Sequence, residues 1–214
     1  MKAIVLAGSR GIGKGIADKL KDICDEVVTT SSSQLDTSNI EQVKKFVKEQ
    51  GSTDILVLNT GGPPAKNFFE ITEDEWLKYY NQLFYSFVYI LQNLKMNDGG
   101  YIFLISSHQI KEPKDTMSLS VAYRIAFSSI LKLLTKTYAK RQVTCINIAP
   151  GPIATDRLKS LVSDMKALEA RLPLGRIGTV EELGLFVKSI VENNIKYLTG
   201  VTINFDGGHS TYVL

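Results

Sequence analysis

Three glycines near the start of the chain have the spacing of a phosphate-binding turn. Gly8, Gly11 and Gly13 follow the apolar run Ala3–Leu6 and precede a helical pattern that begins at Ile16. A strand, a glycine-rich turn and a helix in this order let backbone N–H groups approach a pyrophosphate at the positive end of the helix. Because a glycine motif alone is weak evidence, the rest of the chain decides how much weight this one carries.

The composition is that of an ordinary globular protein. The chain has 214 residues, is 44% hydrophobic and carries a net charge of +3. This length suits a single domain, residues 1–214, and the small charge argues against nucleic acid or a membrane as a partner. Cys24 and Cys145 lack metal-ligand spacing and make no disulfide framework, so we expect no metal and a reduced, cytoplasmic protein. We see no signal peptide and expect no apolar stretch long enough to span a bilayer.

Strand-like and helix-like segments alternate along the chain. The expected strands are residues 2–7, 26–30, 54–58, 101–105, 143–148 and 201–204, and the expected helices are 12–22, 38–50, 73–96, 119–139, 157–171 and 179–193. Thr72 with Glu75, and Thr179 with Glu182, have the pattern of capping boxes. The alternation, with strands apolar enough to be buried on both faces, predicts an α/β fold in which helices cover both faces of a doubly wound parallel sheet.

The connection after the second expected strand is unusually short. Only residues 31–35 separate the strand that ends at Thr30 from Asp36. A helix needs more residues than this, so the connection is either a bare loop or contains a very short strand.

Taken together, the motifs resemble those of the short-chain dehydrogenase/reductase family over nearly the whole chain. The family's Thr-Gly-x-x-x-Gly-x-Gly turn corresponds to residues 6–13, with Leu6 and Ala7 at its first two positions. Further matches are Leu58-Asn59-Thr60-Gly61, Ile105-Ser106-Ser107, the segment 147–155, Pro173-Leu174-Gly175-Arg176-Ile177-Gly178 and Asp206-Gly207-Gly208. The resemblance implies a single-domain Rossmann fold, shortened after strand two, and a homodimer or homotetramer.

The resemblance also implies a nicotinamide cofactor and the residues that bind it. They are Gly8, Ser9, Arg10, Gly11, Ile12, Gly13, Ser31, Asp36, Asn59, Gly61, Pro150, Gly151, Ile153 and Thr155. NAD enzymes of this kind place an acid at the end of the second strand, which would repel a 2′-phosphate. Residues 30–33 here are Thr-Ser-Ser-Ser, and Arg10 in the turn can pair with a phosphate. We therefore expect NADP(H).

The catalytic residues depart from the family pattern. Ser107 matches the family's catalytic serine, whereas its tyrosine and the lysine four residues later have no direct counterpart, because Tyr123 is followed by Phe127. In one register Tyr123 keeps its role and the lysine is lost. In the other, Ser120 takes the tyrosine position and Arg124 the lysine position, again on one helix face.

Proton transfer can be assigned in more than one way. Tyr123 is the better acid of the two hydroxyls, and a neighbouring Arg124, together with the nicotinamide charge, is expected to lower its pKa. His108, beside Ser107, titrates near neutrality and is a further candidate. The family's helix asparagine falls on Leu83 here, and Gln82 is expected to face elsewhere.

The resemblance implies an oxidoreductase that moves hydride between NADP(H) and a carbonyl or alcohol carbon, in the manner of 3-oxoacyl reductases, with Ser107, Tyr123 and Arg124 as catalytic residues. A different function stays open, because up to three of the four usual catalytic positions are changed. The chain would then be a non-catalytic NADP(H)-binding sensor or partner subunit. Residues 156–172 are expected either to cover an apolar substrate or to pack as an ordinary amphipathic helix.

Overall fold

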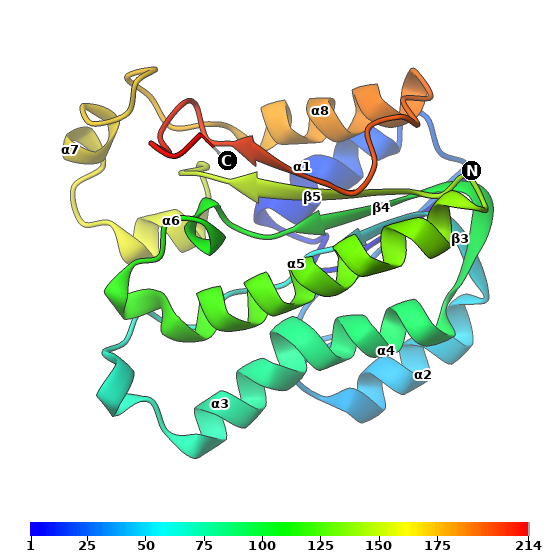
Figure 1. Cartoon of the computed structure of the whole chain (residues 1–214), viewed down its shortest axis with the longest axis horizontal. Coiled ribbons are helices and arrows are strands. Elements are labelled where there is room, and N and C mark those ends of the chain that lie inside the picture. Colours follow the sequence, from blue (N-terminus) through cyan, green and yellow to red (C-terminus); the bar gives the residue numbers. More distant parts are fainter. Residues whose placement is uncertain (214) are drawn as a thin grey trace.

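The computed structural model, which describes residues 1–213, is built around one parallel sheet of six strands (Figure 1). The strands are β1 (Lys2–Val5), β2 (Glu26–Thr29), β3 (Ser52–Leu58), β4 (Lys95–Ile105), β5 (Thr144–Pro150) and β6 (Val201–Phe205), in the spatial order β2-β1-β3-β4-β5-β6. The predicted doubly wound α/β fold is confirmed. Strand β4 begins six residues before its predicted start because Lys95 and Met96 pair with Ser52 and Thr53 ahead of a register shift.

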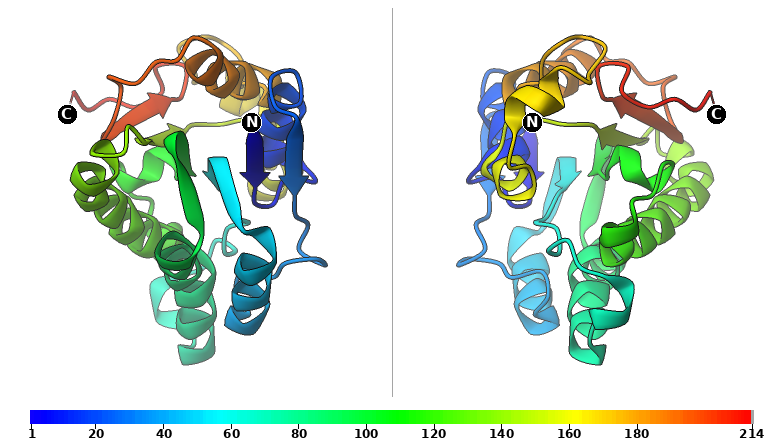
Figure 2. Two further views of the ribbon diagram at one scale, coloured as in Figure 1. Left: turned by 90° about the vertical axis from the view of Figure 1, so that its right-hand side faces the viewer. Right: turned by 90° about the vertical axis from the view of Figure 1, so that its left-hand side faces the viewer.

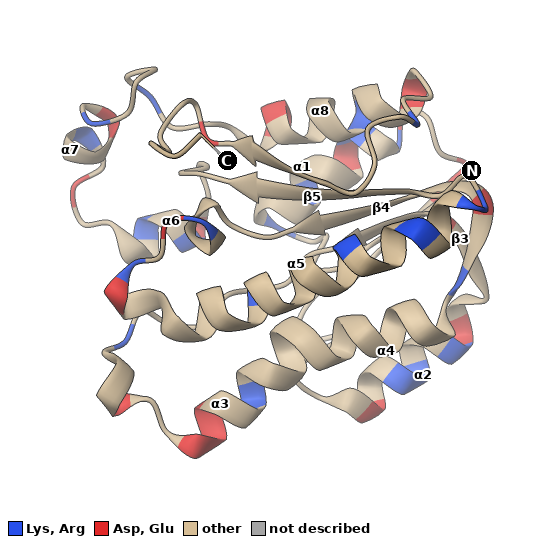
Figure 3. Ribbon diagram, in the orientation of Figure 1, with Lys and Arg blue, Asp and Glu red and all other residues tan. Residues whose placement is uncertain are grey.

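Helices cover both faces of the sheet (Figure 2). Helices α1 (Gly11–Leu20) and α8 (Val180–Glu192) lie on one face, and α2 (Ile40–Gln50), α4 (Ser86–Asn93) and α5 (Ser118–Ala139) lie on the other. Alternate strand residues supply the two cores: Leu56 and Ile102 point to one, and Val57 and Phe103 to the other. Burial of strands on both faces explains their nearly continuous apolar sequences, and Figure 3 shows the charged residues mainly outside the sheet.

The shortened connection is a bare loop. Residues 30–39 form turns without a helix or strand, so β2 is an edge strand of the sheet. Side chains order this loop: the Asp36 carboxylate accepts hydrogen bonds from the backbone N–H and hydroxyl of Ser38, and Asn39 caps α2.

Two predicted helices differ from the structure. The expected helix 73–96 consists of α3 (Glu73–Tyr80), a π-helical turn (Asn81–Tyr85) and α4, and it ends at Asn93. The expected helix 157–171 is divided into α6 (Asp156–Leu161) and α7 (Met165–Glu169), and neither has a buried residue. Short 3-10 turns occur at Phe68–Glu70, His108–Ile110 and Asp115–Met117.

One helix corrects the expectation that no segment could span a bilayer. Asp115–Ala139, which contains α5, is long and apolar enough by length and composition, with a mean hydropathy of 1.3. It nevertheless joins the neighbouring strands β4 and β5 and packs Phe127 and Leu131 into the core, so its place is within this fold. Only 22% of its most apolar window is buried, which leaves apolar side chains on its outer face.

Candidate functional site

The glycine turn lies between β1 and α1 and is held in a tight conformation. Ala7 and Gly11 both have positive φ angles, of 48° and 54°, and a Cβ on Gly13 would collide with the carbonyl oxygen of Ala7. The Asn59 side chain, at the end of β3, donates to the Leu6 carbonyl oxygen at 3.3 Å. These contacts keep side chains out of the turn, so its backbone stays accessible.

The N-terminus of α1 can accept an anion. Helices α2, α3 and α8 are capped by the side chains of Asn39, Thr72 and Thr179, whereas α1 has neither a side-chain cap nor an acidic residue in its first turn. Its first N–H groups and the positive end of its dipole therefore remain available for a phosphate. Together with the closely packed turn, this end of α1 fits the pyrophosphate of a dinucleotide.

Hydroxyl groups and one arginine lie next to this turn. Thr30, at the end of β2, accepts a hydrogen bond from the Ala7 N–H at 3.0 Å. The hydroxyls of Ser31 and Ser33 are 2.8 Å apart. Arg10 is exposed, and its side chain makes no hydrogen bond to residues 1–213. Residues 30–33, just after β2, include no acidic residue, and Arg10 is available to pair with a phosphate.

The loop after β3 is connected to the π-helical turn. The Gln82 amide donates to the Gly61 carbonyl oxygen at 2.8 Å, and the Thr60 and Thr37 hydroxyls are 2.9 Å apart. The expectation that Gln82 faces elsewhere is therefore wrong: the π turn brings Gln82 to the loop, while Leu83 is buried in the core. Residue counting along a regular helix could not detect this shift.

The predicted loop after β5 packs against three other segments. The Pro150 carbonyl oxygen lies 3.1 Å from His108 Nδ1, and a Cβ on Gly151 would lie 2.6 Å from Asp206 Cβ. Ile153 pairs with Gly178, and Thr155 caps α6.

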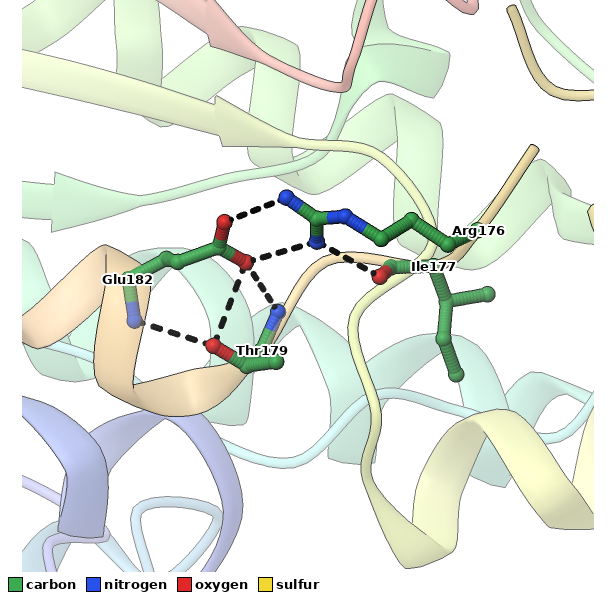
Figure 4. A network of polar contacts seen from close by, with 4 residues as sticks. All are labelled: Arg176, Ile177, Thr179 and Glu182. Atoms are coloured by element: carbon green, nitrogen blue, oxygen red, sulfur yellow. Dashed lines mark hydrogen bonds and ion pairs between the residues drawn. The ribbon is translucent and has the colours of Figure 1, made fainter. Parts of the chain in front are cut away.

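A polar network of Arg176, Ile177, Thr179 and Glu182 orders the segment that enters α8 (Figure 4). Arg176 and Thr179 both bond the carboxylate of Glu182, whose pKa falls to about 2 chiefly because of the Arg176 hydrogen bond. Both predicted capping boxes are confirmed.

Ser120 and Arg124 lie together on the inner face of α5. The Arg124 Nε donates to Ser120 Oγ at 3.2 Å, and its Nη1 donates to the carbonyl oxygen of Ile105 at 2.9 Å. Ile105 is two residues before Ser107, whose Oγ accepts from the Gln109 N–H and keeps its own proton free. The carboxyl ends of β3 and β4 and the inner face of α5 thus converge on one place, which is where ligands bind in open α/β sheets.

Tyr123 points to a different partner. Its hydroxyl donates to the Trp76 carbonyl oxygen at 3.0 Å, and its ring packs edge-on against Trp76 and Tyr80 of α3. Contrary to one part of the expectation, Arg124 does not lower the pKa of Tyr123 in the structure. Burial, with a smaller contribution from Tyr80, raises the pKa of Tyr123.

His108 is buried and remains neutral near pH 7. Burial lowers its pKa below the usual value, although the contact with the Pro150 carbonyl oxygen opposes this effect. Because one ring nitrogen faces that carbonyl, His108 stabilises the loop after β5.

The sequence motifs missed Arg157 on α6. Its Nη2 donates to the Pro63 carbonyl oxygen, which places its guanidinium over the loop after β3. One feature of the sequence could have pointed to Arg157: it stands two residues after Thr155, in the segment expected to cover the substrate.

Known proteins resemble this chain along nearly its entire length. The family model described as enoyl-(acyl carrier protein) reductase matches residues 15–210. The 3-oxoacyl-(acyl-carrier-protein) reductase FabG of Buchnera aphidicola subsp. Baizongia pistaciae is 26% identical, with 96% of each chain covered. A short chain dehydrogenase family protein from Francisella tularensis subsp. tularensis SCHU S4 has a TM-score of 0.87 at 22% identity, covering 97% of this chain and 98% of its own. A blue fluorescent protein from a metagenomic library, solved in complex with NADPH, has a TM-score of 0.85 at 24% identity, with 98% of both chains covered.

Proposed function

This chain belongs to the short-chain dehydrogenase/reductase family of oxidoreductases, and we propose that it transfers hydride between NADP(H) and a carbonyl or alcohol carbon. One observation carries this proposal. Ser120 and Arg124 converge with the loop of Ser107 at the carboxyl end of the sheet, where the uncapped N-terminus of α1 also lies. The whole chain, residues 1–214, would act as one cofactor-binding domain.

Several features support NADP(H). The glycine turn and the α1 N-terminus would hold the pyrophosphate, and Arg10 with the hydroxyls of Ser31 and Ser33 would hold the 2′-phosphate. The similar metagenomic protein was solved with NADPH. Asn59 bonds the turn and Thr155 lies beside Gly11, and with Gly61 and Ile153 they would hold the nicotinamide end.

We assign the proton to Ser120 rather than to Tyr123. The cofactor, when bound, would supply hydride to a carbonyl carbon. Ser107 and Ser120 donate hydrogen bonds to the carbonyl oxygen, which becomes negative as hydride arrives and then takes one proton. Ser120 gives that proton, and the Nε–H of Arg124 stabilises the charge left on its oxygen until solvent returns a proton. Because the alkoxide formed is about as basic as a serine alkoxide, this transfer is not strongly uphill.

The test compares single variants in NADPH oxidation with a panel of ketones and 3-oxoacyl thioesters. Ser107→Ala and Ser120→Ala should each lower kcat/KM by roughly 10²-fold, the lower end of what one acid contributes. Tyr123→Phe should stay within about threefold, because its hydroxyl bonds Trp76. A large loss in Tyr123→Phe alone would return the proton to that tyrosine.

Cofactor binding is tested without turnover. Arg10→Ala should weaken NADPH binding about 10- to 100-fold, the range for a charge-assisted hydrogen bond, and leave NADH binding almost unchanged. Tight NADPH binding without turnover of any carbonyl or alcohol would favour the non-catalytic sensor instead.

We also propose a cytoplasmic homo-oligomer. Cys145 is a buried free thiol whose pKa burial raises to about 12, and Cys24 is a partly buried free thiol, as suits a reducing compartment. The outer faces of α3 and α5 carry exposed apolar side chains, as does the π-helical turn at Tyr85, and a second copy would cover them.

A further inference from the structure

The side chains of Arg124 and Arg157 meet over the loop after β3. Arg157 has no part in the reaction described above. We propose that Arg157, together with Arg124, binds a carboxylate of the substrate, so that the preferred substrates are oxo acids whose carboxylate lies within a few bonds of the reacting carbonyl. This inference rests on the proposed function, because it places the anion beside the carbonyl that is reduced.

Both guanidinium groups reach the same residue. A Cβ on Gly62 would lie 3.6 Å from Arg157 Nη2 and 3.8 Å from Arg124 Nη2. Arg157 comes from α6 and Arg124 from α5, so two elements far apart in sequence bring positive charge to one point. Arg124 also bonds the Ile105 carbonyl oxygen and Ser120, which ties this point to the reacting groups.

Neither arginine has an acidic partner. No Asp or Glu oxygen of residues 1–213 lies within 4.0 Å of either guanidinium, whereas Arg141 and Arg176 pair with Asp98 and Glu182. Arg157 donates one hydrogen bond, to Pro63, out of the five N–H donors of a guanidinium. Its remaining donors can hold a carboxylate bidentately.

The two like charges act on each other. Burial, with a further contribution from the charge of Arg157, lowers the pKa of Arg124 to about 10. Burial also lowers the pKa of Arg157. A bound anion would relieve both effects, because it sits between the two cations and replaces the lost water.

A cofactor phosphate could supply the same negative charge. The uncapped α1 N-terminus and Arg10 already provide for phosphates, whereas Arg157 lies over Pro63 on the side of Arg124. We therefore assign the anion to the substrate, and the experiment separates the two sources.

The experiment compares pyruvate with methyl pyruvate and acetoacetate with methyl acetoacetate, since each ester keeps the carbonyl and loses the charge. The ratio of kcat/KM for acid over ester should fall about 10- to 100-fold in Arg157→Gln, as expected for one charged hydrogen-bonding partner. Arg157→Lys, which keeps the charge without the planar fork, should fall in between. Arg171→Gln, a change in the same exposed segment, should keep the wild-type ratio.

Two binding measurements complete the test and need no turnover. NADPH affinity should change less than about twofold in Arg157→Gln, and calorimetry should show oxamate binding to the NADP⁺-loaded wild type but not to this variant. A parallel loss of NADPH affinity, or an equal loss for acid and ester, would overturn the inference and give Arg157 to the cofactor or the fold. Reduction of the esters without any preference for acids would refute the inference alone. Arginine-dependent oxamate binding without turnover of any carbonyl would refute only the proposed reduction.

Discussion

Ala7 occupies a backbone conformation that favours glycine. Its φ of 48° lies in the left-handed region, where the Cβ of an L-residue costs roughly 1–2 kcal/mol. The family motif that this turn resembles has a glycine at this position, where a glycine would avoid the strain. The tight turn is therefore formed here at some cost in stability.

Ala7→Gly should raise the free energy of unfolding by about 0.5–1 kcal/mol, since relief of the strain exceeds the added freedom of the unfolded chain. Ala17→Gly, inside α1, is the matched control and should lower it by about 1 kcal/mol. Urea unfolding of both variants checks the pair, and a destabilised Ala7→Gly would contradict the strain argument.

His108 gives the fold a pH dependence of known sign. Its pKa is lower in the folded protein than the usual 6.5, so below that value the unfolded chain takes up a proton that the folded one refuses. The free energy of unfolding should fall as pH drops from 7 through the range just below 6.5, by at most about 1.4 kcal/mol per pH unit for this one group.

Urea unfolding at several pH values measures this fall. His108→Asn, which keeps a side-chain N–H for the Pro150 carbonyl oxygen, should flatten it. His209→Asn removes only the smaller repulsion from the neighbouring ring and should flatten it in part. An unchanged slope in His108→Asn would assign the effect to other groups.

At the scale of elements, local signals in the sequence were reliable and interactions between distant segments were not. The capping boxes at Thr72 and Thr179 and all six strands could be predicted, because each depends on residues close in sequence. The π turn has no such signal, and it changes which way Gln82 points. The direction of Tyr123 depends on α3, which packs against it from 47 residues away.

The candidate site shows the same division. The glycine turn and the polar loop after β2 follow from sequence spacing. The sequence could give the pairing of Ser120 with Arg124 only as one of two registers. In the other, Tyr123 takes the place of Ser120, and both hydroxyls lie on the same helix. Arg157 has no motif, and only folding brings it to Gly62.

Thr179→Ala should lower the free energy of unfolding by about 1 kcal/mol, because the Glu182 N–H at the start of α8 loses its cap. Chemical denaturation measures this change. The control is Thr135→Ala in α5, whose hydroxyl donates only to the Leu131 carbonyl oxygen of its own helix, and it should have a smaller effect. Equal losses in Thr179→Ala and Thr135→Ala would remove any special role for the cap.

At the scale of the whole molecule, one face carries several exposed apolar side chains. Ile125 and Leu133 of α5 are 46% and 72% exposed. Leu77 and Tyr80 of α3 and Tyr85 of the π-helical turn are also exposed. Figure 1 shows α5 beside α4 with no other helix across their outer faces. Exposed apolar side chains grouped on neighbouring helices are the surface through which the proposed oligomer would form.

If the chain forms the proposed homo-oligomer through this face, Ile125→Glu and Leu133→Glu should convert it to a smaller species in sedimentation velocity. A buried glutamate without a partner opposes association strongly. Leu185→Glu, on α8 across the sheet, should leave the contact through α5 intact. A monomeric wild type would refute the proposed oligomer.

The loop of residues 30–39 makes cofactor choice separable from the architecture. It leaves an edge strand, carries Ser31 and Asp36, and enters α2 without contributing a strand or helix to the sheet. Its exposed positions can thus be exchanged as a cassette, provided that Leu35, which packs in the core, and Thr30, which bonds the glycine turn, are kept. Grafting loops that begin with an acid in place of Ser31 would turn the chain into a compact scaffold for selecting NADH-using catalysts.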